Sequence, residues 1–291
     1  MSEQKLTARS NYLISAEALQ VRLGAPEVKI IDATTHLVPS EQGGFGSVSG
    51  RKDYDDAHIP GALFFDLQSE MSDNASQFRF TVPPLAQFNA RVSAAGIKAD
   101  DEVIIYAGNH PMWACRMWWL FKVFGHASVK VLDGGLPYWQ ARGYPTTQAV
   151  PSVDPSEYQG SFNSDMVIDG DAIANTQPEG LCLLNALSPA QFVGEGAHYG
   201  RPGHIEGSRN TPYSAFLDRD QRFIDNAAMA SLFEAVGVVE DQAVVTYCGG
   251  GIAASVPIFA LALLGREDRV QLYDHSLSEW AANAAWPMVQ G

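Results

Sequence analysis

Short apolar runs alternate with segments of helical periodicity along the chain. The apolar runs are rich in Val, Ile, Leu and Tyr, which is typical of buried strands, and the segments between them carry apolar positions at helical spacing. Strands are predicted over 28–33, 102–108, 128–132, 180–186, 242–248 and 270–275, and helices over 84–97, 115–125, 226–238 and 255–265. Because strands that alternate with helices pair in parallel through crossover connections, the pattern predicts an α/β fold with mainly parallel sheets flanked by helices.

The two halves of the chain repeat each other. Asp133 matches Asp274, and the runs 103–108 and 244–249 are similar in sequence. The two pairs are separated by the same number of residues. Such self-similarity indicates a duplicated domain. A stretch rich in Pro, Ser and Thr without periodicity lies between the copies and is typical of a linker. The sequence therefore predicts a first domain, a linker and a second domain, over 1–146, 147–164 and 165–291 respectively.

One cysteine lies at the end of a predicted strand. Cys248 follows the apolar run 243–247 and precedes three glycines and an alanine-rich segment. Thiolate is the reactive form of cysteine, so a nucleophilic Cys248 needs positive potential nearby. Backbone N–H groups at the start of the following helix can supply it as an anion cradle, and the predicted members are Gly249, Gly250, Gly251, Ile252 and Ala253. The alternative is an inert buried thiol with glycines that serve only close packing.

Composition limits the partners. The 291 residues are 46% hydrophobic, which suffices for the cores of about two domains. A net charge of −14 and a pI near 4.8 argue against nucleic acids and anionic lipids as partners. The N-terminus lacks the pattern of a signal peptide, and no window approaches the length of a membrane span. We therefore expect a cytoplasmic protein with no membrane partner.

The remaining cysteines and histidines do not indicate a metal site. Cys115 and Cys182 lie in a predicted helix and a predicted strand and are expected to be core thiols. Three widely spaced cysteines fit neither a disulfide framework nor a CxxC site, so all are predicted to be free. Glu195, His198 and His204 could be drawn as a metal trio, but their spacing matches no helical ligand motif. No metal is predicted.

Taken together, these features resemble the two-domain rhodanese-type sulfurtransferases, which include thiosulfate and 3-mercaptopyruvate sulfurtransferases. The resemblance rests on the duplication, the HIPGA and HIEGS signatures, the run 118–145 and the loop YCGGGIAA, and it covers nearly the whole chain. In that family the C-terminal copy carries the active cysteine and the N-terminal copy has lost it. Ala107 stands where the repeat would place a first-copy cysteine. The resemblance thus implies tandem rhodanese-like domains, the first of them catalytically inactive.

The resemblance also implies a double-displacement reaction that needs no cofactor. The Cys248 thiolate would take sulfur from thiosulfate or 3-mercaptopyruvate, become a persulfide, and pass that sulfur to cyanide or a thiol. The neutral loop CGGGIAA is closer to the pattern of mercaptopyruvate-preferring members than to the cationic loops of thiosulfate-preferring ones. Gly250 and Ala253, however, replace hydroxyl-bearing residues of that pattern. The donor therefore stays open between the two.

An anionic donor needs a positive counter-charge. Arg201 matches the family arginine that precedes the GHI signature, and Arg209 lies close to it in sequence, so both are predicted to bind substrate. A further family arginine is replaced by Gln191. His58 is predicted either to line the cleft or, because His204 repeats it in the other copy, to hold a turn.

Two other classes of protein share part of the pattern. A cysteine phosphatase would carry an arginine at the sixth position after its cysteine, where this chain has Ala254, so that class is disfavoured. A rhodanese-like module that carries persulfide sulfur to a protein partner without turnover is the alternative to an enzyme. Turnover with a small-molecule acceptor would distinguish the two.

Overall fold

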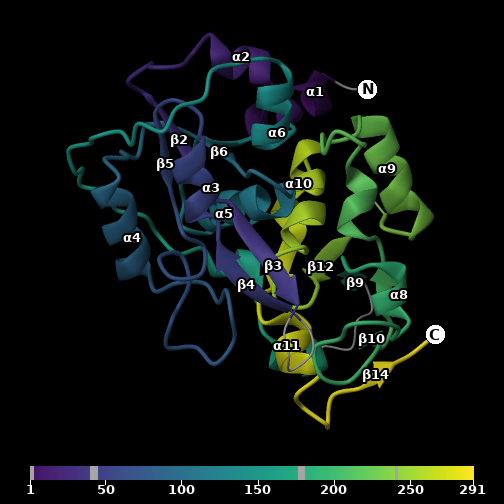
Figure 1. Cartoon of the computed structure of the whole chain (residues 1–291). Helices are drawn as coiled ribbons and strands as arrows, with labels where there is room; N and C mark the ends of the chain where they lie inside the picture. The colour runs from purple at the N-terminus through teal and green to yellow at the C-terminus, as the bar shows by residue number, and fades with distance from the viewer. Residues whose placement is uncertain (1–2, 40–44, 176–180, 240–241) are drawn as a thin grey trace.

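Two five-stranded parallel sheets organise the chain, one in each half (Figure 1). The computed structural model describes residues 3–39, 45–175, 181–239 and 242–291. The strand order in the first sheet is β1 (Leu13–Ile14), β7 (Val129–Leu132), β6 (Glu102–Tyr106), β2 (Val28–Asp32) and β5 (Ala62–Phe64). The order in the second sheet is β11 (Arg209–Asn210), β9 (Leu181–Asn185), β12 (Ala243–Tyr247), β13 (Val270–Tyr273) and β8 (Val167–Ile168).

The two sheets have the same topology. The duplication pairs β6 with β12 and β7 with β13, and in each sheet these two strands lie side by side. Every ladder within the two sheets is parallel. The predicted α/β fold of two duplicated domains is therefore confirmed.

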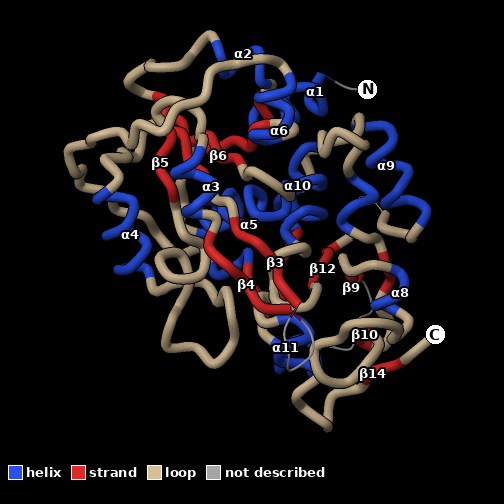
Figure 2. The backbone as a smooth tube through the Cα atoms, viewed as in Figure 1, coloured by secondary structure: helices blue, strands red, loops and turns tan. Residues whose placement is uncertain are grey.

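Helices flank both sheets, and long loops connect them (Figure 2). The helices of the first half are α1 (Glu3–Tyr12), α2 (Ala16–Gln20), α3 (Arg51–Asp56), α4 (Leu85–Ala94), α5 (Pro111–Val123) and α6 (Gly135–Ala141). Those of the second half are α7 (Gly170–Asn175), α8 (Pro189–Phe192), α9 (Asn226–Ala235), α10 (Ser255–Leu263) and α11 (Ser276–Trp280). Short 3-10 turns cover Ser164–Met166, Tyr213–Phe216 and Glu267–Arg269. Within the described ranges, no helix has the length and apolar character needed to cross a membrane.

Two small antiparallel pairs lie outside the main sheets. Strands β3 (Thr35–Pro39) and β4 (Phe45–Ser49) form a hairpin, and β10 (His204–Ile205) pairs with β14 (Met288–Val289). The hairpin follows β2 and lies where the two halves of the molecule meet (Figure 1). The apolar pattern of the sequence did not predict it.

The two domains share a hydrophobic cluster, and the first domain has a second cluster of its own. Helices α5 and α10 pack on each other at the centre of the molecule, and all nine residues of α10 are buried. Trp118 of α5 meets Phe259 of α10 edge to face, with ring centroids 4.9 Å apart. One hydrophobic cluster runs through both halves without interruption. The aromatic side chains of α5 therefore belong to the core, and Trp118 also forms interdomain surface.

The segment between the domains runs along the surface of the first domain. Thr147 pairs with His58, the Ser156 N–H donates to the Ser93 carbonyl, and the Asn163 N–H donates to the Val123 carbonyl. Residues 148–163 form neither helix nor strand. The domain boundaries at 146, 147–164 and 165 stay a prediction.

Candidate active site

Strand β12 brings Cys248 to the carboxyl end of the second sheet. The strand is central in that sheet, and four of its five residues are buried. Cys248 follows it directly, and α10 begins only at Ser255, after the loop 249–254. Ligands of open parallel sheets bind at this edge. The thiol is only 3% exposed and lines a cavity of about 260 Å³.

The first turn of α11 fixes the start of this loop. The Cys248 N–H donates to Ser276 Oγ at 3.0 Å, and that hydroxyl donates to the Tyr273 carbonyl at 2.8 Å. The Ser278 N–H and hydroxyl both donate to the Gly249 carbonyl. Ser276 has φ of +52°, a left-handed conformation that is rare outside glycine. The backbone of the loop is thereby held at its first two residues.

The backbone amides of the next five residues differ from that of Cys248, since the described part of the chain offers them no acceptor. Among the described residues, no carbonyl or side chain accepts a hydrogen bond from the N–H groups of 249–253. Backbone N–H groups near a buried site normally find a partner, so this set is available to an anion. The geometry agrees with the predicted cradle in this respect.

Each of the three glycines in the loop occupies its position for a different physical reason. A Cβ at Gly249 would overlap the ring of Tyr199, which lies against it. Gly251 has φ of +78°, and a Cβ there would lie 2.5 Å from the Asp274 carbonyl oxygen. At Gly250 the nearest atom is the hydroxyl of Ser278, 3.5 Å away, so this glycine leaves room beside the thiol. Of the three, only Gly251 needs glycine for its backbone conformation.

Both domains contribute walls to the cavity around Cys248. The first domain provides Leu37 and Phe45 of the hairpin, Arg79 and Phe80 of the loop before α4, and Met112 of α5. The second domain provides Leu187, Gln191, Tyr199, Tyr213, Cys248, Gly250, Ile252, Ala253 and Ser278. Most of these side chains are apolar. Arg79 is the only charged side chain among the described lining residues.

Two tyrosines in the wall stay protonated. Burial, with the nearby Cys248 as a smaller cause, raises the pKa of Tyr199 well above its ordinary value. Burial also raises the pKa of Tyr213. Both phenols are therefore neutral groups at physiological pH, and the Tyr199 ring serves as a wall over Gly249.

The structure does not bring Arg201 to the cavity. Its guanidinium donates to the backbone carbonyls of Trp280, Ala281, Asn283 and Trp286 at 2.7–3.0 Å. These bonds tie the loop after α11 to the segment that precedes β10. The geometry gives this arginine a structural task, although the sequence pointed to substrate binding.

Arg209 and His58 also lie outside the cavity wall. Arg209 donates to the carbonyls of Val236 and Gly237 at the end of α9. His58 donates from Nδ1 to the Tyr54 carbonyl at 2.7 Å and stacks on the Tyr54 ring. His204 repeats this arrangement in the other domain, since it bonds the Phe192 carbonyl and stacks on that ring.

The two other cysteines and the candidate metal ligands form no further site among the described residues. Burial raises the pKa of Cys115, which lies in α5, and also that of Cys182 in β9, although Arg209 lowers the latter in part. All three cysteines are free. In the described part of the chain, no group of three or more His, Cys, Asp or Glu side chains is placed to hold a metal ion, Glu195 and its histidine neighbours included.

Sequence reasoning missed Arg79, Tyr199 and Ser276. Ser276 could have been found from the repeat, because it takes the place of Gly135, whose φ of +56° matches. Arg79 gives a weaker signal: the interval from His58 to Tyr106, which contains it, is five residues longer than the matching interval of the second copy. Tyr199 has no signal in the pattern.

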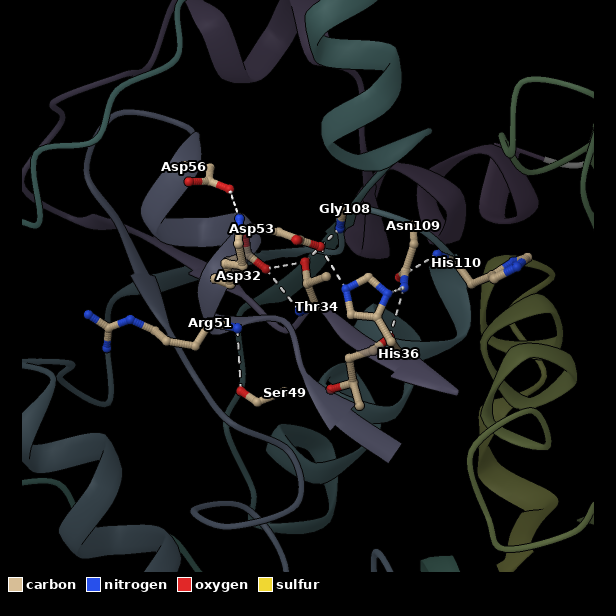
Figure 3. A network of polar contacts seen from close by, with 12 residues as sticks. Asp32, Thr34, His36, Ser49, Arg51, Asp53, Asp56, Gly108, Asn109 and His110 are labelled. Atoms are coloured by element: carbon tan, nitrogen blue, oxygen red, sulfur yellow. Dashed lines mark hydrogen bonds and ion pairs between the residues drawn. The ribbon is translucent and has the colours of Figure 1, made fainter. Parts of the chain in front are cut away.

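In the matching loop of the first domain, polar groups of that same domain hold the backbone and side chains (Figure 3). Ala107 replaces the cysteine, and the Gly108 N–H donates to Thr34 Oγ1 at 2.7 Å. Asn109 Nδ2 donates to the Thr35 carbonyl, and Asn109 Oδ1 accepts the N–H of His110. The loop after β6 thus offers neither a thiol nor the N–H of Gly108.

Comparison with known proteins identifies relatives along the whole chain. Residues 15–142 and 178–283 each match the model of the rhodanese-like domain. Thiosulfate/3-mercaptopyruvate sulfurtransferase 2 of Arabidopsis thaliana is 30% identical over 99% of this chain and 92% of its own. Thiosulfate sulfurtransferase of Rattus norvegicus is 30% identical over 92% of this chain and 90% of its own.

A solved structure shares the fold at similar coverage. The crystal structure of SseA from Escherichia coli, described as a 3-mercaptopyruvate sulfotransferase with the rhodanese fold, superposes with a TM-score of 0.81. It is 28% identical and covers 92% of this chain and 100% of its own.

Proposed function

The chain belongs to the rhodanese family and is an enzyme of the sulfurtransferase class, and we propose that it transfers sulfane sulfur through a persulfide on Cys248. The observation that carries this proposal is the combination, at one strand end, of a thiol that lines a cavity and five backbone N–H groups that have no acceptor among the described residues. The donor is thiosulfate or 3-mercaptopyruvate, and the acceptor is cyanide or a thiol.

In the first half-reaction the Cys248 thiolate attacks the outer sulfur of the donor. With thiosulfate, the sulfur–sulfur bond of the donor breaks and sulfite leaves with the electron pair. With 3-mercaptopyruvate, the carbon–sulfur bond breaks and the pyruvate carbanion that leaves takes up a proton. In either case a new sulfur–sulfur bond forms on Cys248, which becomes a persulfide.

In the second half-reaction the acceptor attacks the terminal sulfur of the persulfide. The bond between the two sulfurs breaks, and the Cys248 thiolate returns as the leaving group. The N–H groups of 249–253 suit both halves, because they stabilise negative charge on sulfur without a side chain that could protonate it.

The cavity favours a small donor over direct delivery from a protein. Its volume of about 260 Å³ suits a small molecule, and the thiol at its wall is nearly inaccessible to solvent. Because both domains form the wall of the cavity, the first copy helps to enclose the donor. A carrier module that hands sulfur to a protein partner is the second candidate, and the same assay separates them.

Steady-state formation of thiocyanate from cyanide tests the proposal, with each donor in parallel and Cys248→Ser as the control. We expect turnover with at least one donor and none in the control. Mass spectrometry of the donor-treated enzyme should find one added sulfur on the peptide that contains Cys248. Added sulfur confined to Cys115 or Cys182 would refute the assignment.

A further inference from the structure

We propose that Tyr199 donates the proton that the pyruvate leaving group takes up when 3-mercaptopyruvate is the sulfur donor. The proposal rests on the sulfurtransferase reaction proposed above and adds a catalytic residue to its first half-reaction. With thiosulfate the tyrosine has no such role, because sulfite leaves with its electron pair and needs no proton. The two donors therefore make different demands on the same side chain.

The phenol end of Tyr199 lies against the loop that follows Cys248. A Cβ on Gly249 would lie 1.8 Å from Cζ of Tyr199, the ring carbon that carries the hydroxyl, and 2.2 and 2.3 Å from the two ring carbons beside it. Tyr199 and Cys248 line the same cavity. Cys248 also contributes to the raised pKa of Tyr199, so the phenol lies within electrostatic reach of the thiolate.

The hydroxyl of Tyr199 is available to a ligand. Among the described residues, no group accepts a hydrogen bond from this hydroxyl or donates one to it. The hydroxyl of a tyrosine that is withdrawn from solvent usually has a partner, so a molecule in the cavity can take that place. Because burial raises the pKa of Tyr199, the hydroxyl carries its proton at physiological pH.

Three other polar side chains of the described wall suit the task less well. Arg79 does not give up a proton, because a guanidinium stays charged in proteins. The amide of Gln191 donates to the Ala197 carbonyl at 3.1 Å. The hydroxyl of Ser278 donates to the Gly249 carbonyl at 2.7 Å and so holds the loop in place.

Tyr213 is the other phenol in the described wall, and its surroundings differ from those of Tyr199. Its ring centroid lies 6.1 Å from that of His110, a residue of the first domain. Burial is the cause of its raised pKa, whereas Cys248 acts on Tyr199 in addition to burial. The contact with the loop of the nucleophile therefore favours Tyr199 as the proton donor.

The residues that follow Tyr199 fix its backbone. Gly200 has φ of +118°, and a Cβ there would lie 3.3 Å from the Cβ of Ala281. Arg201 donates to four backbone carbonyls of the segment 280–286. Because the three residues are consecutive, these contacts hold the tyrosine beside the cavity without using its hydroxyl.

The atoms and electrons of the step balance within the site. When the Cys248 thiolate attacks the thiol sulfur of 3-mercaptopyruvate, the carbon–sulfur bond breaks and its electron pair stays on the leaving carbon as the enolate of pyruvate. The O–H bond of Tyr199 then breaks and a C–H bond forms, which releases pyruvate and leaves a phenolate.

The donor itself supplies the proton that restores Tyr199. The new persulfide still carries the hydrogen of the donor's thiol, and a persulfide is a stronger acid than a phenol. The phenolate therefore takes this proton. The products are pyruvate, a neutral Tyr199 and a persulfide anion, which the N–H groups of 249–253 stabilise.

The test compares the two donors in one variant. We expect Tyr199→Phe to lower kcat/KM for 3-mercaptopyruvate by about 100-fold or more, as for the loss of a general acid. The value for thiosulfate should change by less than about 3-fold, because the variant keeps the ring over Gly249 and loses a step that this donor does not use. Equal losses with both donors, or no loss with 3-mercaptopyruvate, would overturn the proposal.

Tyr213→Phe is the matched comparison, because it removes the other phenol of the described wall by the same change. The ratio of its kcat/KM values for the two donors should stay within about 3-fold of the wild-type ratio. A selective loss with 3-mercaptopyruvate in Tyr213→Phe, and none in Tyr199→Phe, would show that Tyr199 is not the proton donor.

A single turnover isolates the first half-reaction. With enzyme in excess over the donor, mass spectrometry of quenched samples follows the added sulfur on Cys248. In Tyr199→Phe the persulfide should form at the wild-type rate from thiosulfate and slowly from 3-mercaptopyruvate. Formation at the wild-type rate from both donors would contradict the proposal.

The wild type separates this proposal from the proposed function. Transfer from thiosulfate but not from 3-mercaptopyruvate would leave the sulfurtransferase standing and refute the role of Tyr199. Transfer from neither donor would refute the proposed function. If the wild type uses 3-mercaptopyruvate alone, an alkyl thiosulfonate replaces thiosulfate as the control donor, because its sulfinate also leaves without a proton.

Discussion

The loops after β6 and β12 begin at matching positions of the two domains but use their backbone N–H groups differently. After β6, the Gly108 N–H is bonded to Thr34, and Asn109 is fixed by the Thr35 carbonyl (Figure 3). After β12, the N–H groups of 249–253 have no acceptor among the described residues. The first copy therefore differs from the second by more than one missing sulfur. Thr34 of the first copy accepts the hydrogen bond of the Gly108 N–H, a group that an anion cradle would need free.

The turns that follow β7 and β13 differ in the same sense. Gly135 has φ of +56° and carries no side chain, whereas Ser276 adopts φ of +52° and directs its hydroxyl to the Cys248 N–H. The second copy thus accepts backbone strain at a position where the first copy avoids it. Strain of this kind clusters at functional sites.

The sharpest test of the comparison moves the cysteine between the copies. We expect the double variant Cys248→Ser, Ala107→Cys to form thiocyanate at least about 1,000-fold more slowly than the wild type. The thiol at 107 would lie beside a Gly108 N–H that is already bonded, and Ala107 is only 3% exposed. Recovery to about a tenth of the wild-type rate would contradict the account of the first-copy loop.

The matched carboxylates Asp133 and Asp274 should differ in their contribution to stability. Asp274 neutralises the buried Arg116, so Asp274→Asn should lower the free energy of unfolding by about 3–5 kcal/mol. Asp133 pairs with Arg222, whose side chain is 41% exposed, so Asp133→Asn should cost about 1 kcal/mol or less. Urea denaturation of both variants at pH 7 measures the difference.

These two carboxylates also accept matched backbone donors, the N–H groups of Phe223 and Val82 respectively. An asparagine oxygen can accept the same bond, so the comparison isolates the charge. Similar costs for the two variants would mean that the ion pair of Arg116 does not distinguish the domains.

Two substitutions of Ser276 should separate strain from positioning. Ser276→Ala keeps the positive φ and loses the acceptor of the Cys248 N–H, so it should lower stability by about 1–3 kcal/mol. Ser276→Gly copies Gly135 and relieves the strain, so its stability should stay within about 1 kcal/mol of wild type. We expect both to slow sulfur transfer by about 10-fold. Unimpaired transfer in Ser276→Gly would show that the hydroxyl does not position the loop.

The smallest expected effect concerns Asp32, the last residue of β2. Its counterpart in the second domain is Asn185, the last residue of β9. Burial raises the pKa of Asp32, against hydrogen bonds from Thr34 that lower it. The folded state therefore keeps a proton that the unfolded state releases above its ordinary pKa, near 3.8. Stability attributable to this group is lost as pH rises from that value through the raised pKa.

Asp32→Asn copies the second domain and removes this titration. We expect the free energy of unfolding of the variant to improve relative to wild type as pH rises from about 4 to 8. Denaturation curves across that range measure it. A difference that is constant with pH would show that Asp32 does not titrate differently in the two states.

The sequence predicted the three inner strands of each sheet and the helices α4, α5, α9 and α10 because their apolar periods are local, but not the short edge strands or α1. The runs at 28–33 and 242–248 are buried strands, and the segment 255–265 contains the central helix. Cys248 could be singled out because the repeat aligns it with an alanine and glycines follow it. These signals need only neighbouring residues and one internal comparison.

The walls of the cavity could not be predicted in this way. Leu37 and Phe45 belong to a hairpin and line a cavity whose other wall comes from the second domain, so neighbouring residues in the sequence do not indicate their role. Arg79 reaches the cavity through a left-handed turn at Phe80, which no propensity favours. Arg201 shows the converse case, because its match to a family position does not reveal that four carbonyls satisfy it.

The packing of α5 on α10 has a consequence for how this chain can be divided. All of α10, and every residue of α5 except Lys122, is buried against both halves of the molecule. Either copy expressed alone would present a bare apolar helix to solvent, a surface that invites aggregation. We therefore expect the two copies to fold as one cooperative unit and not as two separable modules. Heating should melt it in a single calorimetric transition whose van't Hoff and calorimetric enthalpies agree.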